Sequence, residues 1–450
     1  MIDKRGINEY NKSILIETNI FMLETIKQKG QDMMSKMTKA VRLYGKNDLR
    51  LDEFELPEIA SDEIRAEIVT DSICMSSYKA AVQGNEHKRV PEDIAEHPII
   101  IGHEFCGVIR EVGAKWKDQF RAGEKFSIQP ALGGLEAPGY SFRYCGGAAT
   151  MVNLPAEVME NNCLLDYAGD AFFYGSLAEP MSCIIGAYHA FYHTKPGSPE
   201  HVMGIREGGN LILMAGAGPM GLGAVDYAVH CDRKPKMMVV TDIDDARLAR
   251  AAEVLTVEEA AKNGVALHYV NTGKLEDARA YLMELTAGYG YDDAFIMAPV
   301  KPVVELGDQV LAQDGCMNFF AGPTDHSFTA GVNFYNVHYS GTHIIGTTGG
   351  STDDMRESLQ MMEQGRLNPA VMITHVGGID AAAESTLNLP NIRGGKKLIY
   401  TQIEMPLVAI ADFAKLGETD PMFATLDEIT KRHNGLWSAE AEKFLLKEKM

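Results

Sequence analysis

The chain has 450 residues, which is too long for one ordinary domain and sufficient for two. Apolar residues make up 46% of it and charged residues 23%, a composition typical of globular proteins. The net charge of −20 argues against nucleic acids and anionic membranes as main partners, although a local basic cluster could still bind an anionic substrate. Seven thinly spread cysteines form no disulfide framework, and neither a signal peptide nor a long apolar run is present, which predicts a cytoplasmic protein.

Residues 1–36 are expected to be an N-terminal extension ahead of the first domain. In residues 13–27 the apolar side chains recur at helical spacing, which predicts an amphipathic helix. Two interpretations stay open for it. It is either a loosely held helix that precedes the true start of the chain at Met37, or a helix that contacts another subunit.

Period-two alternation of apolar and polar residues in residues 37–150 predicts short β-strands. The clearest examples are AVRLYG, LRLDEFEL and EIRAEIVTD, which follow one another between residues 40 and 71. The polar stretch at residues 82–97 is expected to be a loop. Because no long helical segments separate these strands, we expect a mostly antiparallel, barrel-like unit.

From residue 176, where a helix is expected, the pattern changes to strands that alternate with helices, which predicts a doubly wound parallel sheet. The strands are expected at residues 211–215, 237–240, 266–270, 293–297, 316–321 and 343–346, with helices at 222–230, 245–253 and 275–286. Beyond the sheet we expect a helix at 351–365, a strand at 396–404 and a mainly helical tail at 409–449. Trp437 and Phe444 are expected to anchor that tail.

The glycine pattern at residues 216–221 predicts a dinucleotide-binding turn. Gly216, Gly218 and Gly221 follow an expected strand and open an expected helix, with Pro219 and Met220 between them. The first glycine would allow the tight turn, the second would let a pyrophosphate reach backbone amides, and the third would permit close helix–strand packing. A purely structural turn is the alternative, but the strand before and the helix after favour a cofactor site.

The residue that ends the next expected strand bears on the choice of cofactor. Asp242 stands 21 residues after the last glycine, where a carboxylate accepts hydrogen bonds from ribose hydroxyls and repels a 2′-phosphate. It favours NAD(H) over NADP(H), although Arg247 nearby could accommodate a phosphate. The nicotinamide end is expected near Ala298, Ala321 and Gly346, which end successive strands.

Residues of metal-ligating type are candidates for a zinc site: Cys74, His103 and Glu179, with Glu104 beside His103. Catalytic zinc takes three protein ligands of N, S or O type and keeps a fourth position for water or substrate. Taken singly, each candidate has a plainer interpretation. They could be a small buried thiol, a core histidine that hydrogen-bonds a carboxylate, and an acid favoured by a helix dipole.

Five motifs together resemble the zinc-dependent medium-chain dehydrogenases. They are CMS at residues 74–76, GHEFCGVIREVG at 102–113, GEKF at 123–126, AEP at 178–180 and GAGPMGLG at 216–223. The resemblance extends over residues 37–404 and is strongest to the polyol dehydrogenase branch. Within that branch, MSSYKAAVQGNEHKRVP and RHNGLWSAEAEKFLL are similar to the L-sorbose-1-phosphate reductases and related sugar-phosphate dehydrogenases.

The resemblance implies an α/β fold of two domains. A GroES-like β-barrel catalytic domain would comprise residues 37–180 and 346–450, the latter including the helical tail. A Rossmann domain with a doubly wound parallel sheet would comprise residues 181–345. The resemblance also implies a homodimer or homotetramer, assembled by strand pairing in the cofactor domain.

For the active site, the resemblance implies that Cys74, His103 and Glu179 are zinc ligands. Glu104 would reach the metal through water or exchange into its coordination. The hydroxyl of Ser76 would hydrogen-bond the reacting oxygen of the substrate. These residues would together carry catalysis.

The chain departs from the family pattern just after the ligand cysteine. Met75 replaces the common glycine, Ser77 the usual aspartate, and Lys79 the frequent relay histidine. A lysine cannot relay a proton by tautomeric exchange, so Lys79 could instead offer a cation to a substrate phosphate. A basic cluster would support it, formed by Lys79, His87, Lys88 and Arg89; the alternative is a solvated charged loop.

The expected activity is hydride transfer between a ketose, such as L-sorbose 1-phosphate, and a polyol, with zinc as Lewis acid and Ser76 handling the hydroxyl proton. One catalytic zinc is expected and no structural zinc, because Cys145 is the only cysteine between residues 125 and 150. A zinc dehydrogenase of a free polyol or of L-threonine is the close alternative. A non-catalytic dinucleotide-binding sensor is the distant one.

Overall fold

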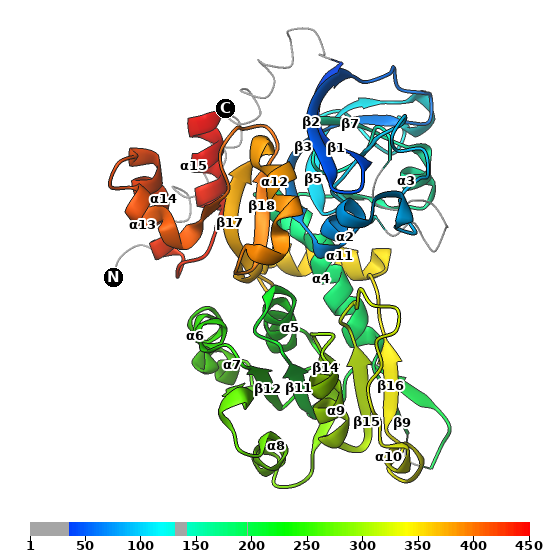
Figure 1. The fold of residues 1–450 in the computed structure, drawn as a ribbon, viewed down its shortest axis with the longest axis vertical. Coiled ribbons are helices and arrows are strands. Elements are labelled where there is room, and N and C mark those ends of the chain that lie inside the picture. The colour runs from blue at the N-terminus through cyan, green and yellow to red at the C-terminus, as the bar shows by residue number, and fades with distance from the viewer. Residues whose placement is uncertain (1–35, 131–141, 196) are drawn as a thin grey trace, which may run out of the picture.

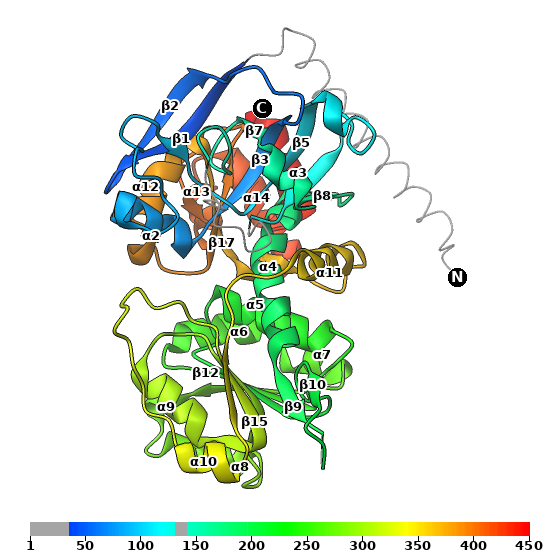
Figure 2. The ribbon, with the colours of Figure 1, turned by 90° about the vertical axis from the view of Figure 1, so that its right-hand side faces the viewer.

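The computed structural model describes residues 36–130, 142–195 and 197–450, which fold into two bodies (Figure 1). The predicted helix at residues 13–27 lies outside the described part of the chain. Helix α4 (Phe172–Ala190) runs from one body into the other, and α11 (Thr352–Glu363) packs across it (Figure 2). None of the helices in the described ranges combines the length and apolar character needed to cross a bilayer.

The first body is built on a mostly antiparallel sheet, as predicted. Its strand order is β19-β17-β18-β3-β5-β6-β8, with β7 paired to β3, and β17 and β18 are its one parallel pair within the described residues. The strands are β3 (Ile64–Ile73), β5 (Phe105–Val112), β6 (Lys125–Ile128), β7 (Met151–Leu154), β8 (Leu164–Asp166), β17 (Ile373–Gly378), β18 (Lys396–Tyr400) and β19 (Val408–Ala409). A smaller sheet joins β1 (Met37–Gly45), β2 (Asp48–Glu55) and β4 (Ile99–Ile100).

Short helices surround this body and a helical tail follows it. They are α2 (Met75–Gln83), α3 (Ala156–Glu160), α12 (Ala382–Leu387), α13 (Phe413–Leu416), α14 (Pro421–Arg432) and α15 (Ala439–Lys449). The tail helices α13–α15 stand beside β17 (Figure 1). Trp437 is 1% exposed and anchors the tail as predicted, whereas Phe444 is only partly buried. The polar stretch after α2 contains turns and one short 3-10 helix, Gly84–Glu86.

The second body is the predicted parallel sheet. Its order is β13-β12-β11-β14-β15-β16, and every pair is parallel. The strands are β11 (Asn210–Met214), β12 (Met237–Asp242), β13 (Ala266–Asn271), β14 (Tyr291–Ile296), β15 (Leu311–Phe319) and β16 (His343–Gly346). The helices are α5 (Pro219–His230), α6 (Asp245–Val254), α7 (Val257–Lys262), α8 (Ala278–Leu285), α9 (Lys301–Gln309) and α10 (Phe334–Tyr339), and a hairpin joins β9 (Tyr192–Thr194) to β10 (His201–Met203).

Two differences from the sequence-based expectation concern element ends and identities. Strand β18 ends at Tyr400, four residues early, because the chain turns there and the Ile403 amide donates to the Tyr400 carbonyl. Helices α2, α3, α7, α9, α10 and α12 were not predicted. The short apolar periods of these helices give little signal on their own, and neighbouring strands determine where they pack.

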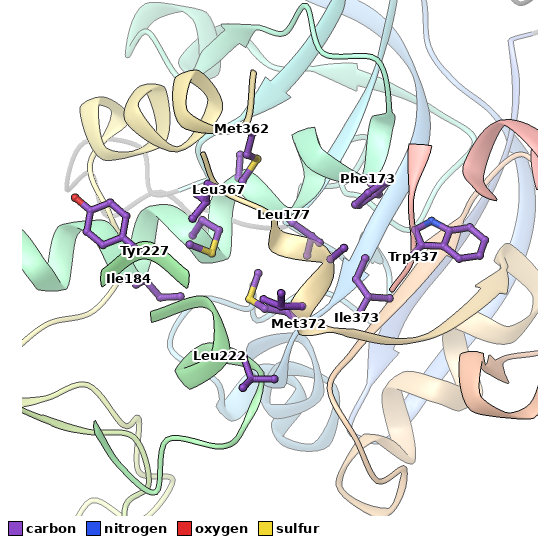
Figure 3. Close-up of a cluster of buried hydrophobic side chains, with 14 of the residues drawn as sticks. Phe173, Leu177, Ile184, Leu222, Tyr227, Met362, Leu367, Met372, Ile373 and Trp437 are labelled. Atoms are coloured by element: carbon purple, nitrogen blue, oxygen red, sulfur yellow. The ribbon is translucent and has the colours of Figure 1, made fainter. Parts of the chain in front are cut away.

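One buried apolar cluster joins the two bodies. It contains Leu177 of α4, Leu222 of α5, Met362 of α11 and Trp437 of the tail (Figure 3). Full burial of one such aliphatic side chain stabilises a fold by roughly 1.5–3 kcal/mol. The shared cluster therefore holds α4 firmly between the two bodies.

Candidate active site

The predicted metal residues come from three separate elements that meet in one place. Cys74 is the N-cap residue of α2, directly after β3, while His103 and Glu104 lead into β5. Gly102 permits the preceding turn, because its φ is +94° and an added Cβ would lie 2.5 Å from a carboxylate oxygen of Asp71. One ligand-type atom from each of Cys74, His103 and Glu104 lies within 4.8 Å of the other two.

Glu179 lies within electrostatic range of these residues but outside that group of three. It is a buried residue of α4, and its Oε1 accepts a hydrogen bond from the Cys183 thiol at 3.6 Å. Burial and the charge of Glu104 raise the pKa of the Glu179 carboxyl to about 7, while His103 opposes the shift. Glu179 is therefore electrostatically coupled to the other three residues without closing the group.

Glu104 is held by two buried partners. Its Oε1 forms an ion pair with Lys396 of β18, and its Oε2 accepts from the Ser72 hydroxyl. Glu104 is 1% exposed and Lys396 is 7% exposed. Burial raises the pKa of Glu104, but Lys396, His103 and Ser72 outweigh it, so the net shift is downward. Burial lowers the pKa of Lys396, but the charge of Glu104 and its neighbours raises it by more, so the net shift is upward.

The candidate ligands differ in how well their protonation suits a metal cation. Burial, with help from Lys396 and Arg89, lowers the pKa of His103 and favours the neutral imidazole that binds metals. Burial and the charge of Glu104 raise the pKa of the Cys74 thiol, so a bound cation would have to displace its proton. Sulfur, nitrogen and carboxylate oxygen form a donor set that zinc prefers. Ligand atoms around a tetrahedral zinc lie about 3.3–3.8 Å apart, which falls within the 4.8 Å that separates the candidate atoms at most.

Two serines border these residues. Ser76 Oγ lies 3.5 Å from Cys74 Sγ, which places its hydroxyl at the predicted reaction centre. Ser77 Oγ lies 3.4 Å from His103 Nδ1. A partner on the ring nitrogen of a metal-binding histidine fixes the orientation of the ring. Ser77 therefore orients His103, a role that the sequence did not indicate.

The predicted basic cluster lies beside the candidate ligands. Burial lowers the pKa of Arg89 and the Glu179 charge opposes that shift, so the guanidinium lies within electrostatic range of Glu179. Burial lowers the pKa of His87, and the charges of Arg89, Lys88 and Lys79 lower it further, so these three cations lie within electrostatic range of His87. Lys88 is exposed, whereas Lys79 Nζ donates to the Gly322 carbonyl at 2.9 Å and so reaches the second body.

The glycine turn has the shape that a dinucleotide needs. An added Cβ at Gly221 would lie 1.9 Å from the Gly216 carbonyl oxygen, so helix and strand pack closely there. An added Cβ at Gly218, the N-cap of α5, would point into open space where a pyrophosphate can approach. Ala215 carries the positive φ of the turn, +57°. Gly216 permits the close return of the chain at this turn, because an added Cβ would lie 2.7 Å from the Leu213 Cβ.

The remaining residues predicted to bind the cofactor lie at or near the carboxyl ends of the parallel strands. Asp242 ends β12, and its Oδ1 accepts from the Ile243 and Asp244 amides at 2.8 and 3.1 Å. Arg247 is exposed on α6, 4.0 Å from the Asp244 carboxylate. Ala298 follows β14, Ala321 follows β15 with its amide bonded to the Ile296 carbonyl, and Gly346 ends β16. Pro219 and Met220 lie in the first turn of α5, at the same end of the sheet as these strand ends.

Comparisons with known proteins agree with this geometry. Residues 60–179 match the alcohol dehydrogenase GroES-like domain family, and residues 219–364 match the zinc-binding dehydrogenase family. Mannitol-1-phosphate 5-dehydrogenase from Aliivibrio fischeri is 52% identical over 416 residues, 92% of this chain and 98% of that protein. The chain belongs to the zinc-binding dehydrogenases. L-sorbose 1-phosphate reductase from Klebsiella pneumoniae is 48% identical to it over 412 residues, 91% of this chain and 97% of that protein.

A solved structure confirms the predicted fold of this zinc-binding dehydrogenase. The 2R,3R-butanediol dehydrogenase from Bacillus subtilis superposes with a TM-score of 0.63 at 18% identity. The match covers 81% of this chain and 99% of that structure. The two-domain architecture, a GroES-like body with a Rossmann body, is thereby confirmed.

Lys396 is, with Ser77, a residue beside the candidate ligands of this zinc-binding dehydrogenase that the sequence pattern did not reveal. It opens a predicted strand, and its partner Glu104 lies 292 residues earlier. Two consecutive buried lysines at the start of an apolar strand are the only signal, since lysine is almost never fully buried without a partner. That signal indicates a buried acid but does not identify it.

Proposed function

We propose that this dehydrogenase interconverts a ketose phosphate, such as L-sorbose 1-phosphate, and a polyol phosphate by hydride transfer. The observation that carries the proposal is the basic cluster beside the metal-ligand candidates, in a chain whose net charge is −20. Arg89 offers a guanidinium, which suits the geometry of a phosphate. Mannitol-1-phosphate 5-dehydrogenase and L-sorbose 1-phosphate reductase, which are 52% and 48% identical to this chain, are both named for sugar phosphates. Their names support this substrate class.

We assign the chemistry to residues as follows. Cys74, His103 and Glu179 would hold one catalytic zinc, and Glu104 would reach it through water or exchange into its coordination. A zinc held there acts as a Lewis acid toward the substrate oxygen, and a bound nicotinamide gives or takes the hydride. Ser76 holds the proton of the reacting hydroxyl, and its distance of 3.5 Å from Cys74 Sγ supports this role.

We further propose NAD(H) as the preferred cofactor. The buried carboxylate of Asp242 at the end of β12 would repel a 2′-phosphate. Arg247 lies 4.0 Å from the Asp244 carboxylate, whose negative charge would weaken the attraction of Arg247 for such a phosphate. The pyrophosphate would lie at Gly218, on the amides that begin α5. No structural zinc is proposed, because residues 125–150 contain a single cysteine, Cys145.

A substrate panel tests the function. The purified enzyme is assayed for oxidation of NADH and of NADPH with ketose phosphates and with the corresponding free ketoses. We expect NADH to be preferred and kcat/KM for a ketose phosphate to exceed that for the free ketose at least about tenfold, since a hydrogen bond to a charged group contributes about 1.5–3 kcal/mol. Equal values for both sugars would favour a dehydrogenase of a free polyol or of L-threonine.

Substitution of Arg89 tests the phosphate contact directly. Arg89→Ala is expected to raise KM for the ketose phosphate about tenfold, because it removes a charged hydrogen bond. For the free ketose KM should change less than twofold. Lys88→Ala provides the matched comparison: Lys88 belongs to the same cluster but is exposed, so a smaller effect is expected. A loss shared equally by both sugars would exclude Arg89 from phosphate recognition.

We also propose that two copies associate through the edge strand β16. Within the described residues this strand has a neighbour on one side only. Large apolar side chains are exposed around it, namely Phe334, Tyr335, Tyr339 and Ile344. Light scattering should give at least twice the chain mass of 49.3 kDa, and a monomer at micromolar concentration would reject the proposal.

All seven cysteines are unpaired, which supports a reducing compartment such as the cytoplasm.

A further inference from the structure

Helix α4 carries Glu179, and the amides of its first turn are capped by a residue from outside the helix. Its N-cap residue is Ala171, whose side chain offers no acceptor. Instead, the amides of Phe172 and Phe173 donate to the two carboxylate oxygens of Glu442, at 2.6 and 3.0 Å. Glu442 belongs to α15, in the C-terminal tail, and is 1% exposed. A distant carboxylate thus satisfies amides that a helix cannot satisfy by itself.

Glu442 is itself held in place by hydrogen bonds and packing. The Tyr400 hydroxyl donates to its Oε2 at 3.0 Å, and the Trp437 indole donates to the Tyr400 oxygen at 2.7 Å. Tyr400 lies on β18, the strand that also carries Lys396. Phe173 and Trp437 belong to one buried cluster (Figure 3). The cap is therefore fixed to the sheet of the first body.

A proline makes the position of Glu179 depend on that cap. Pro180 lies inside α4 and has no N–H to donate to the Ser176 carbonyl, which interrupts the helix ladder directly after Glu179. Before Pro180, Ser127 of β6 donates to the Gly175 carbonyl and Ser358 of α11 donates to the Ala178 carbonyl. After Pro180, the Tyr188 hydroxyl donates to a carbonyl of α5. The contacts of Glu442 at the first two residues of α4 therefore help to fix the part of the helix that leads to Glu179.

We infer that Glu442 is a positioning residue that sets the place of the metal ligand Glu179 through the first two turns of α4. This inference rests on the zinc site proposed above. It predicts that the C-terminal tail controls metal affinity and geometry although it supplies no ligand. It also gives α15 a role beyond covering the sheet.

The test uses Co²⁺ in place of zinc, because its visible spectrum reports the geometry of the ligands. Experiments are run at pH 8, above the pKa of about 7 to which burial raises Glu442, so that the wild-type side chain is ionised. In Glu442→Gln an NH₂ group would face an amide donor. We expect the Co²⁺ dissociation constant to rise about tenfold, as for other groups that support metal ligands, and the cobalt bands to change. NADH affinity should stay unchanged.

A matched variant separates positioning from stability. Ile429→Val removes a buried methyl group from α14 of the same tail, outside the hydrogen bonds that hold Glu442. It should lower Tm, yet keep the wild-type cobalt spectrum and affinity. If Glu442→Gln also keeps both, the inference is wrong. Glu442→Met, which removes the charge and places no NH₂ group against an amide donor, gives the same test if the glutamine variant does not fold.

The two proposals fail in different ways. Wild-type protein that binds neither zinc nor Co²⁺ would reject the zinc site itself. Metal binding that Cys74→Ser leaves intact would do the same. Wild-type metal binding together with an unaltered Glu442→Gln variant would reject only the role of Glu442.

Discussion

Replacement of Cys74 by serine is expected to abolish turnover while dinucleotide binding persists. Cys74 would supply the thiolate of a three-ligand zinc site, and serine is a much weaker zinc ligand. A metal acting as a Lewis acid contributes several kcal/mol to the lowering of the barrier, so kcat should fall at least about 1,000-fold. The glycine turn at Gly216–Gly221 lies in the other body, so NADH affinity should stay within about twofold.

Three measurements check this prediction on the same samples. Metal analysis should show about one zinc per wild-type chain and little in Cys74→Ser. Fluorescence titration measures NADH binding, and a reductase assay measures turnover. Cys163→Ser serves as the control, because Cys163 is a buried thiol outside the site that donates to the Asn161 carbonyl at 3.5 Å, as a serine hydroxyl can. Turnover that survives in Cys74→Ser, or in fully metal-free enzyme, would contradict the zinc mechanism.

The strands of the second body and its helices α5, α6 and α8 were predictable because their signals are local. Apolar strands alternating with helices lead to a parallel sheet, and the glycine pattern lies between β11 and α5, as expected. The detail of that turn was not predictable. Ala215 adopts the left-handed conformation in place of a glycine. Tertiary contacts of the surrounding strands impose that conformation, and no pattern in the residues around position 215 indicates it.

The first body was harder to predict, because its sheet combines segments far apart in the sequence. Strand β18 pairs with β3, so residues 397–400 lie against residues 70–73. Alternation predicted both strands but could not predict that they are neighbours. The same strand then brings Lys396 to Glu104 and Tyr400 to Glu442. The partners of the metal site thus depend on long-range pairing, whereas the ligand candidates themselves lie in motifs.

The ligand set illustrates the same division. The motifs singled out Cys74, His103 and Glu179 as ligands, with Glu104 as a tuning group. The structure places Glu104 within the close group and Glu179 beside it. Glu104 already accepts from Lys396 and Ser72, while among the described residues the Glu179 carboxylate accepts from the weakly donating Cys183 thiol, so a bound cation would more readily draw in Glu179. The assignment of Glu179 as third ligand stays a prediction.

Removal of the Lys396 charge is expected to destabilise the protein severely. Glu104 and Lys396 are both almost fully buried, and loss of one partner leaves an uncompensated charge in the interior. Such a loss costs about 3–5 kcal/mol, so Lys396→Met should lower the free energy of unfolding by that amount. Urea unfolding in the presence of a chelator measures it. Added zinc should reduce the loss, because a bound cation would compensate part of the Glu104 charge.

Two further variants identify the cause of that loss. In Lys396→Met combined with Glu104→Gln no buried charge remains, so most of the stability should return. Lys431→Met removes a lysine from an exposed pair with Asp427 on α14 and should cost less than about 1 kcal/mol. If the double variant is as unstable as Lys396→Met alone, packing of the lysine stem and not charge pairing accounts for the effect. The ion pair would then not be what keeps Glu104 ionised behind the metal site.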